Sequence, residues 1–182
     1  RARAPTPPPP PPAVERSLSP DRAIRPGSDE LTFMIRNIPN RYSAKMLLEF
    51  FNNKGFEWTY DFFYLPVDFR NNCNVGYAFV NFPLRTDAER FREVFEGRHL
   101  QAFQSRKILR FDPARVQGFE ANRAHFRNSH VTSADVNEDW KPILFDCARR
   151  VRVPFPRPDW ELDAAAGAAA GAAGWAGGRG AA

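Results

Sequence analysis

The eight residues that end at Phe82 alternate in character in a way that predicts a β-strand with two apolar faces. Successive side chains of a strand point to opposite faces, so Ala78, Val80 and Phe82 share one face. The other face carries two neighbouring aromatic residues, Tyr77 and Phe79. Because a half-buried strand usually presents polar side chains to solvent, this second face is either buried or suited to contact a flat ligand.

The spacing of apolar residues elsewhere predicts three more strands and two helices, in the order βαββαβ. The four strands cover 31–38, 60–69, 75–82 and 107–112, and the helices cover 43–53 and 86–95. Ser43 and the pair Thr86–Asp87 are suited to cap the two helices, and Gly55 and Gly97 to end them. The expected fold class is α+β, a ferredoxin-like four-stranded antiparallel sheet with both helices on one face, which leaves the other face bare.

A further helix is predicted over 117–128, where the sequence has no proline and a loose apolar stripe. After it come Trp140, Ile143, Leu144 and Phe145, which are too apolar to be left in water cheaply. We therefore expect residues 117–153 to dock on the domain as a C-terminal extension.

Composition divides the rest of the chain. We expect 1–30 to be a Pro-rich disordered linker, because Pro7–Pro12 prefers extended polyproline II, 31–116 to be the folded domain, and 154–182 to be a disordered tail rich first in Pro and then in Ala and Gly. The proline run could be a ligand for a protein partner, although a stiff spacer is the more ordinary interpretation. The first residue is Arg1 rather than Met, which indicates a piece of a longer protein.

The formal net charge of +5 and the pI of about 9.6 suit a polyanionic partner, although charge alone decides little. Between 31 and 153 there are 19 Lys and Arg against 14 Asp and Glu, so the excess lies outside the predicted tails.

The two cysteines, Cys73 and Cys147, lie far apart without a CxxC motif, and the three histidines share no metal-ligand spacing with them. This argues against a disulfide scaffold or a zinc site and indicates a reducing intracellular setting, nuclear, cytoplasmic or both. No segment is long and apolar enough to span a membrane. We expect no metal, no cofactor, no membrane association and no small-molecule substrate.

Two short motifs resemble those of the RNA recognition motif. The stretch from Val75 to Phe82 is similar to the octamer basic-Gly-aromatic-small-aromatic-aliphatic-x-aromatic, with Val75 in place of the basic residue. The stretch from Phe33 to Ile38 resembles the companion hexamer, with Met34 where a stacking aromatic usually stands. The alternative is an ordinary buried sheet with helices.

The details resemble the C-terminal RNA recognition motif of the Mei-two-like meiosis regulators more closely than the generic motif. The resemblance covers about 31–146 and is carried by residues 34–42, 45–48, 60–62, 64–66, 68–69, 73–79, 114–118 and 125–129. Met34 and Val75 are normal for that subfamily, whereas Pro113 departs from it. The resemblance implies sequence-selective binding of single-stranded RNA and a role in the control of meiosis and differentiation.

The resemblance and the alternation together place the RNA site on the bare face of the sheet. Exposed rings stack on bases, while polar groups and cations meet base edges and phosphates. The main platform is expected to be Tyr77 and Phe79, and Tyr64 and Phe62 join it from the neighbouring strand. The remaining candidates are Met34, Arg36, Asn81, Arg110 and, if the extension adds to the surface with Arg115 and His125, also Arg123 and Arg127. Against these assignments, Phe62 could belong to the core, the arginines could be solvated charges, and the extension could merely plug apolar surface.

Two other functions remain open at this point. Some domains of this fold bind peptides through the helical side with an Arg-x-Phe loop, but here that loop reads Arg98-His99-Leu100 and the first helix carries only Glu49 as an acid. Acylphosphatases share the βαββαβ order, but the turn at 39–41 has no glycine and no nucleophile–base pair is visible, so we expect no catalytic residue.

Overall fold

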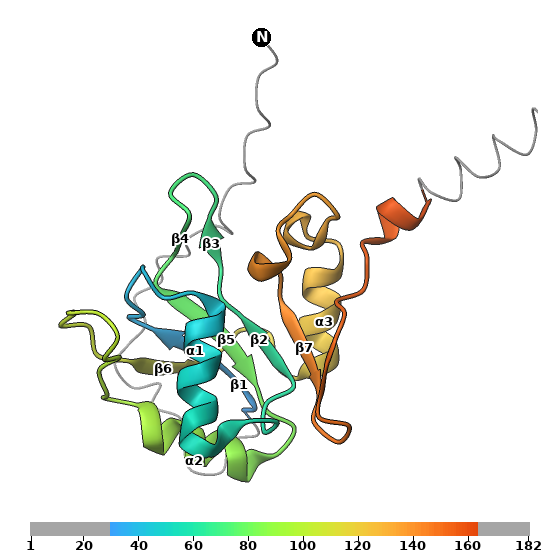
Figure 1. The fold of residues 1–182 in the computed structure, drawn as a ribbon. Helices are drawn as coiled ribbons and strands as arrows, with labels where there is room; N and C mark the ends of the chain where they lie inside the picture. The colour runs from blue at the N-terminus through green and yellow to red at the C-terminus, as the bar shows by residue number, and fades with distance from the viewer. Residues whose placement is uncertain (1–29, 164–182) are drawn as a thin grey trace, which may run out of the picture.

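The structure, a computed structural model, describes residues 30–163, and within them one antiparallel sheet carries helices on both of its faces. Predictions that concern residues 1–29 and 164–182, including the proline run and most of the Ala/Gly-rich tail, lie outside the described residues. Figure 1 shows α1 in front of the sheet, α2 at the bottom of the view and α3 beside β7.

The sheet has six strands rather than the four that were expected. In spatial order they are β6 (Arg110–Pro113), β1 (Thr32–Arg36), β5 (Tyr77–Asn81), β2 (Phe62–Tyr64), β7 (Ile143–Asp146) and β8 (Val151–Val153). The first four follow the predicted βαββαβ order. The extension adds the other two, because β7 pairs with the edge of β2, with Phe62 opposite Leu144 and Phe63 opposite Ile143. The pairing covers backbone groups that β2 would otherwise expose at the edge of the sheet.

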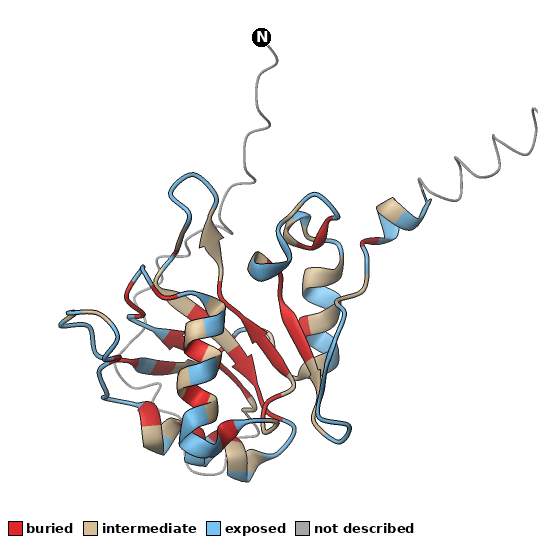
Figure 2. Cartoon of the chain, viewed as in Figure 1, coloured by how far each residue is buried: buried red, intermediate tan, exposed pale blue. Residues whose placement is uncertain are grey.

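The main core lies between the sheet and the helices α1 (Ala44–Phe51) and α2 (Arg85–Phe95). The inward-facing residues of β1 and β5 are buried there, as the alternation predicts, and they appear red in Figure 2. Phe91 of α2 lies at the centre, with its ring centroid 4.8 Å from that of Phe51 and 5.0 Å from that of Phe82. Aromatic pairs at these separations add to the stabilisation that burial provides.

The start of α1 is confirmed, whereas the start of α2 is not. Ser43 Oγ accepts a hydrogen bond of 3.2 Å from the Met46 N–H, which satisfies one of the free donors of the first turn. The cap predicted at Thr86–Asp87 is wrong, because α2 begins at Arg85 and Leu84 precedes it without a side-chain cap. Asp87 lies instead in the first turn, where its charge suits the helix dipole.

The strand predicted over 60–69 is broken in the structure. It ends at Tyr64, and Val67–Asp68 forms a separate short strand, β3, that pairs with β4 (Cys73–Asn74) in a hairpin. Pro66 lies at the break, where it has no N–H to continue the ladder. The hairpin turn is fixed by Asp68, whose carboxylate accepts hydrogen bonds from the Arg70 N–H and the Asn71 side chain.

The extension begins with the predicted helix, observed as α3 (Phe119–Arg127), and continues through the short helices η2 (His130–Thr132) and η3 (Glu138–Trp140) into β7. The disordered tail expected from residue 154 does not begin there. Phe155 packs against a buried cluster of Phe62, Tyr64 and Leu144 that lies beneath α3, and Asp159 forms an ion pair of 2.6 Å with Arg127. These contacts hold at least part of residues 154–163 against the domain.

The two cysteines are free thiols in the structure. Cys147 Sγ lies 3.3 Å from the Tyr60 carbonyl oxygen, and burial raises the pKa of this thiol to about 11, with the nearby Asp61 carboxylate adding to the effect. Within residues 30–163 no cluster of His, Cys, Asp and Glu side chains could hold a metal ion, and no helix is long and apolar enough to cross a membrane.

Candidate nucleic-acid interface

The register of β1 and β5 places four candidate side chains together on the face opposite α1 and α2. Arg36 lies opposite Tyr77, and Met34 lies opposite Phe79. The two aromatic rings are 5.6 Å apart and inclined at 78°. All four side chains are at least partly exposed. We call this set the open platform.

Two cations and one carboxylate border the open platform. Arg36 Nη1 lies 3.2 Å from Asp112 Oδ2, and both side chains are about half exposed. Arg110 lies opposite Arg36 on the edge strand β6 and is exposed. An ion pair in water contributes little stability, so Arg36 can exchange Asp112 for a phosphate at small cost.

Gly76 positions the first ring of the open platform through its backbone conformation. Its φ is +93°, a value that side chains other than glycine rarely tolerate. A Cβ at this position would meet the Ile38 carbonyl oxygen only at 3.7 Å, an ordinary contact. The same turn is held by the Ile38 N–H, which donates to the Gly76 carbonyl at 2.9 Å. The glycine is therefore needed for the turn before Tyr77 rather than for room beside it.

Phe62 and Tyr64 lie on the predicted face but are not available to a ligand, which corrects their assignment as exposed stacking residues. Helix α3 covers them. The Phe126 ring stacks on Phe62 at 5.7 Å and 21°, and meets Tyr64 edge-on at 4.8 Å. Their exposed fractions are 0% and 6%. Alternation predicted the correct face of the sheet for both residues, but α3 covers the part of that face on which they lie.

Asn81 is also covered, so its assignment as a reader of base edges is wrong for this structure. It is 1% exposed. Its Oδ1 accepts from the Thr32 hydroxyl at 2.6 Å, and its Nδ2 donates to Asp61 Oδ1 at 2.7 Å. A buried amide whose oxygen and nitrogen are both paired inside the protein is not accessible to a ligand.

Asp61 makes this corner sensitive to pH. Burial raises the pKa of its carboxyl to about 6, although the Asn81 hydrogen bond opposes the shift. The fold then binds more protons than the unfolded chain between about pH 4 and 6, so the unfolding free energy falls as the pH rises through this window. Allowing for solvent screening at a partly exposed group, we expect wild type to lose roughly 1–2 kcal/mol of unfolding free energy between pH 4.5 and 7 relative to Asp61→Asn. Urea unfolding across that range measures it, and parallel profiles for the two proteins would contradict it.

The two arginines proposed on α3 are already paired with carboxylates. Arg123 Nη1 lies 3.2 Å from Glu120, and Arg127 is held by Asp159, with its Nε buried. The structure therefore brings together Met34, Arg36, Tyr77, Phe79 and Arg110, and sets Arg123 and Arg127 apart on the cover.

A buried polar network that sequence reasoning missed fixes α3 to the sheet. Gln117 Oε1 accepts from the backbone N–H groups of Leu31 and Thr32, and its Nε2 donates to the Thr32 carbonyl. Asn122, 2% exposed, donates to the Thr32 hydroxyl at 3.2 Å and to the Gly118 carbonyl at 2.8 Å. One signal in the sequence could have indicated this contact. Asn122 lies in the middle of the predicted helix, on the same side as its apolar stripe, where a polar residue is buried only if it is paired.

The two tyrosines of this face remain protonated near neutral pH. Burial raises the pKa of Tyr77, and burial together with the nearby Tyr77 raises that of Tyr64. The Tyr77 hydroxyl is thus a hydrogen-bond donor as well as part of a stacking ring.

The sequence of this chain is similar to one protein family and to several known proteins. A family model described as RNA recognition motif 2 matches residues 30–127. The chain is 45% identical over 130 residues to Protein MEI2-like 4 of Oryza sativa subsp. japonica, covering 70% of this chain and 12% of the relative. It is 43% identical over 133 residues to Protein MEI2-like 4 of Arabidopsis thaliana (72% and 14%), and 39% identical over 153 residues to Protein MEI2-like 3 of the same plant (83% and 19%). The chain spans less than a fifth of the length of these curated relatives.

Among solved structures, the RNA recognition motif of Rna15 with bound RNA (GU) is similar with a TM-score of 0.40 and 15% identity, covering 52% of this chain and 93% of that one.

Proposed function

This chain belongs to the RNA recognition motif 2 family, and from that premise we propose that it binds single-stranded RNA on the half of the sheet that α3 leaves uncovered. The resemblance to the Mei-two-like proteins is confirmed by the relatives that match. The observation that carries the proposal is the open platform, in which two partly exposed rings lie side by side on the half of the sheet face that α3 leaves uncovered.

The open platform suits the chemistry of unpaired bases. Tyr77 and Phe79 offer ring faces, and each base stacked on such a ring contributes about 1–3 kcal/mol. Met34 adds a polarizable apolar flank. Arg36 and Arg110 lie on the two strands beside the rings, where they can meet phosphates. We assign Arg127 to packing within the C-terminal part, because it pairs with Asp159 and its Nε is buried. We leave Arg123 out of the site because it lies on α3, where it pairs with Glu120, and not on the strands of the open platform.

RNA fits this surface better than the alternatives considered from the sequence. The loop at 98–100, which would have to present an aromatic side chain to a peptide, instead buries Leu100 and bridges His99 to Ile108. We propose a binding domain rather than an enzyme. A role of the whole protein in meiosis or differentiation is a proposal that rests on the resemblance alone, as is a protein partner for the Pro-rich segment.

Tyr77→Ala and Phe79→Ala test the proposal. Each is expected to weaken binding to a randomised pool of RNA octamers by about 5- to 150-fold, because each removes one stacking ring at about 1–3 kcal/mol. Fluorescence anisotropy with the purified chain measures the affinity. The thermal midpoint should change little, since both side chains are only partly buried.

Trp160→Ala is the matched control, because Trp160 is also exposed but lies in the helical segment at 159–163, near the end of the described chain and outside the strands of the sheet. It is expected to bind RNA like wild type. Absence of binding by wild type, or equal losses in all three variants, would refute the open platform as the site.

A further inference from the structure

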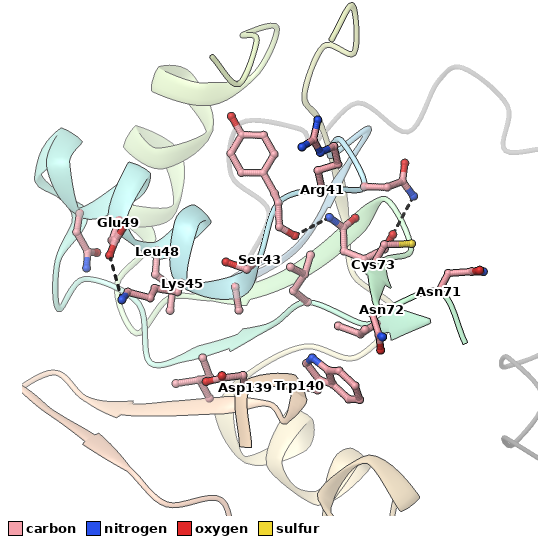
Figure 3. Close-up of a pocket in the computed structure, with 18 of the residues that line it drawn as sticks. Arg41, Ser43, Lys45, Leu48, Glu49, Asn71, Asn72, Cys73, Asp139 and Trp140 are labelled. Atoms are coloured by element: carbon pink, nitrogen blue, oxygen red, sulfur yellow. Dashed lines mark hydrogen bonds and ion pairs between the residues drawn. The ribbon is translucent and has the colours of Figure 1, made fainter. Parts of the chain in front are cut away.

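We propose a second RNA subsite on the helical side of the sheet, in a cavity of about 770 Å³ between α1, the β3–β4 hairpin and the segment from η3 to β7. Figure 3 shows this cavity, with Lys45 at one side, Asn72 at the other, and Asp139 and Trp140 along the bottom of the view. The inference rests on the proposed function, since the subsite would take a nucleotide of the same RNA strand.

The extension creates this cavity. Strand β7 continues the sheet beyond β2, and its Ile143 extends the main core toward the side of α1. Ile143 of β7 and Arg152 of β8 line the cavity together with residues of α1. Trp140 closes one end by contacting Phe69 of the hairpin, with ring centroids 5.4 Å apart.

The lining offers the groups that bind a nucleotide. Leu48, Leu65 and Ile143 give an apolar floor, and the partly exposed Trp140 gives a ring on which a base can stack. The volume falls within the roughly 300–1,000 Å³ typical of small-ligand sites. A base is flat and apolar on its faces and polar at its edges, and such a site matches it in both respects.

Three polar side chains in this lining are available to a ligand. Asn72 has no hydrogen-bond partner within residues 30–163, and a side-chain amide can pair with a base edge. Arg152 has no acidic partner in the same part of the chain, and Lys45 is 85% exposed with its only acid, Glu49, at 4.0 Å. These two cations come from different elements, β8 and α1, and suit the phosphates of a bound nucleotide and its neighbour.

The cavity lies at the same end of the sheet as the open platform. Asn74 lines it and is three residues before Tyr77, so the two surfaces are within roughly 10 Å along the chain. The wall between them is rigid, because Asn74 Nδ2 donates to the carbonyls of Pro39 and Tyr42 and its Oδ1 accepts from the Gly76 N–H. A strand leaving the Tyr77 ring can therefore reach the cavity within a few nucleotides.

The test compares randomised pools of RNA tetramers and octamers on the full chain. The tetramers are long enough for the open platform, and the octamers can also fill the cavity. We expect Arg152→Ala and Trp140→Phe to weaken octamer binding about 3- to 10-fold and to leave tetramer binding unchanged. Arg150→Ala is the matched control, because it removes the same charge from the same β7–β8 hairpin without touching the cavity. Far-ultraviolet circular dichroism and thermal unfolding verify that each variant is folded.

The outcomes separate the two proposals. If wild type binds neither pool, the proposed function fails. Suppose instead that wild type binds tetramers, and that Arg152→Ala and Trp140→Phe have the same octamer affinity as the control Arg150→Ala. The second subsite is then refuted, and the open platform stands. An equal loss of octamer affinity in Arg152→Ala and Arg150→Ala would also refute the second subsite, because it would show a general effect of charge.

Discussion

A chain that ends at Val116 is expected to lose at least about 5 kcal/mol of unfolding free energy relative to one that ends at Asp163. The cut removes α3 and β7, so Phe62 and Tyr64 become exposed and Leu144 is lost from the same cluster. Burying one such side chain contributes about 1.5–3 kcal/mol. The cut also takes away Gln117 and with it the hydrogen bonds to the start of β1. Since whole domains are stable by about 5–15 kcal/mol, the short chain should be largely unfolded.

Urea and thermal unfolding of the two chains measure this difference. Phe126→Ala provides a milder version, because it uncovers Phe62 and Tyr64 while β7 and Gln117 remain; a loss of about 2–3 kcal/mol is expected. His125→Ala is its control, on the neighbouring exposed position of α3. Equal midpoints for the chains ending at Val116 and Asp163 would show that the extension is peripheral to the fold.

The same variant tests whether α3 competes with RNA. If the ligand uses only the open platform, Phe126→Ala should bind RNA within about twofold of wild type once the folded fraction is taken into account. A gain of tenfold would instead mean that RNA stacks on Phe62 and Tyr64 when α3 moves aside. That result would restore the assignment of these residues that the sequence predicted.

The strand faces were predictable because they depend on local periodicity alone. The alternation in β1 and β5 put Ile35, Ala78 and Val80 toward the helices and Tyr77 and Phe79 away from them, as observed. A one-residue shift in register would have moved every side chain to the wrong face, so the pattern leaves little freedom. The open platform could therefore be named from sequence.

What covers a face was not predictable from the same periodicity. Phe62 and Asn81 lie on the face away from α1 and α2 as expected, yet both are buried. Phe62 is buried against α3, which lies more than fifty residues further along the chain. The cover depends on long-range contacts, such as Phe126 on Phe62 and Asn122 on Thr32, that no local pattern encodes. The apolar run at 143–145 indicated docking, but not that it would pair with the edge of β2.

Local exceptions account for the smaller differences. Pro66 divided a run that read as one long strand, and the hairpin that follows supplies a wall of the proposed second subsite. Pro113 departs from the subfamily pattern but is tolerated inside β6, because β6 is an edge strand and can lose one donor.

Phe82→Ala is expected to lower the unfolding free energy by about 3–5 kcal/mol, the usual cost of removing a fully buried ring. Phe82 is 0% exposed, and its ring centroid lies 5.0 Å from that of Phe91 and 6.3 Å from those of Phe33 and Tyr60. These neighbours come from α2, β1 and the segment before β2. Their different origins limit how far the site can collapse to fill the cavity, which places the cost at the upper end of the range.

Tyr77→Ala is the matched comparison, because Tyr77 lies on the same run of alternating residues with its ring on the other face. We expect this substitution to lower the unfolding free energy by less than about 1.5 kcal/mol, since the ring is only partly buried. Its main effect should be a loss of RNA affinity. Urea unfolding and anisotropy on the same two variants give both quantities. A larger loss of stability for Tyr77→Ala than for Phe82→Ala would mean that the register is wrong by one residue, and the open platform would then be part of the core.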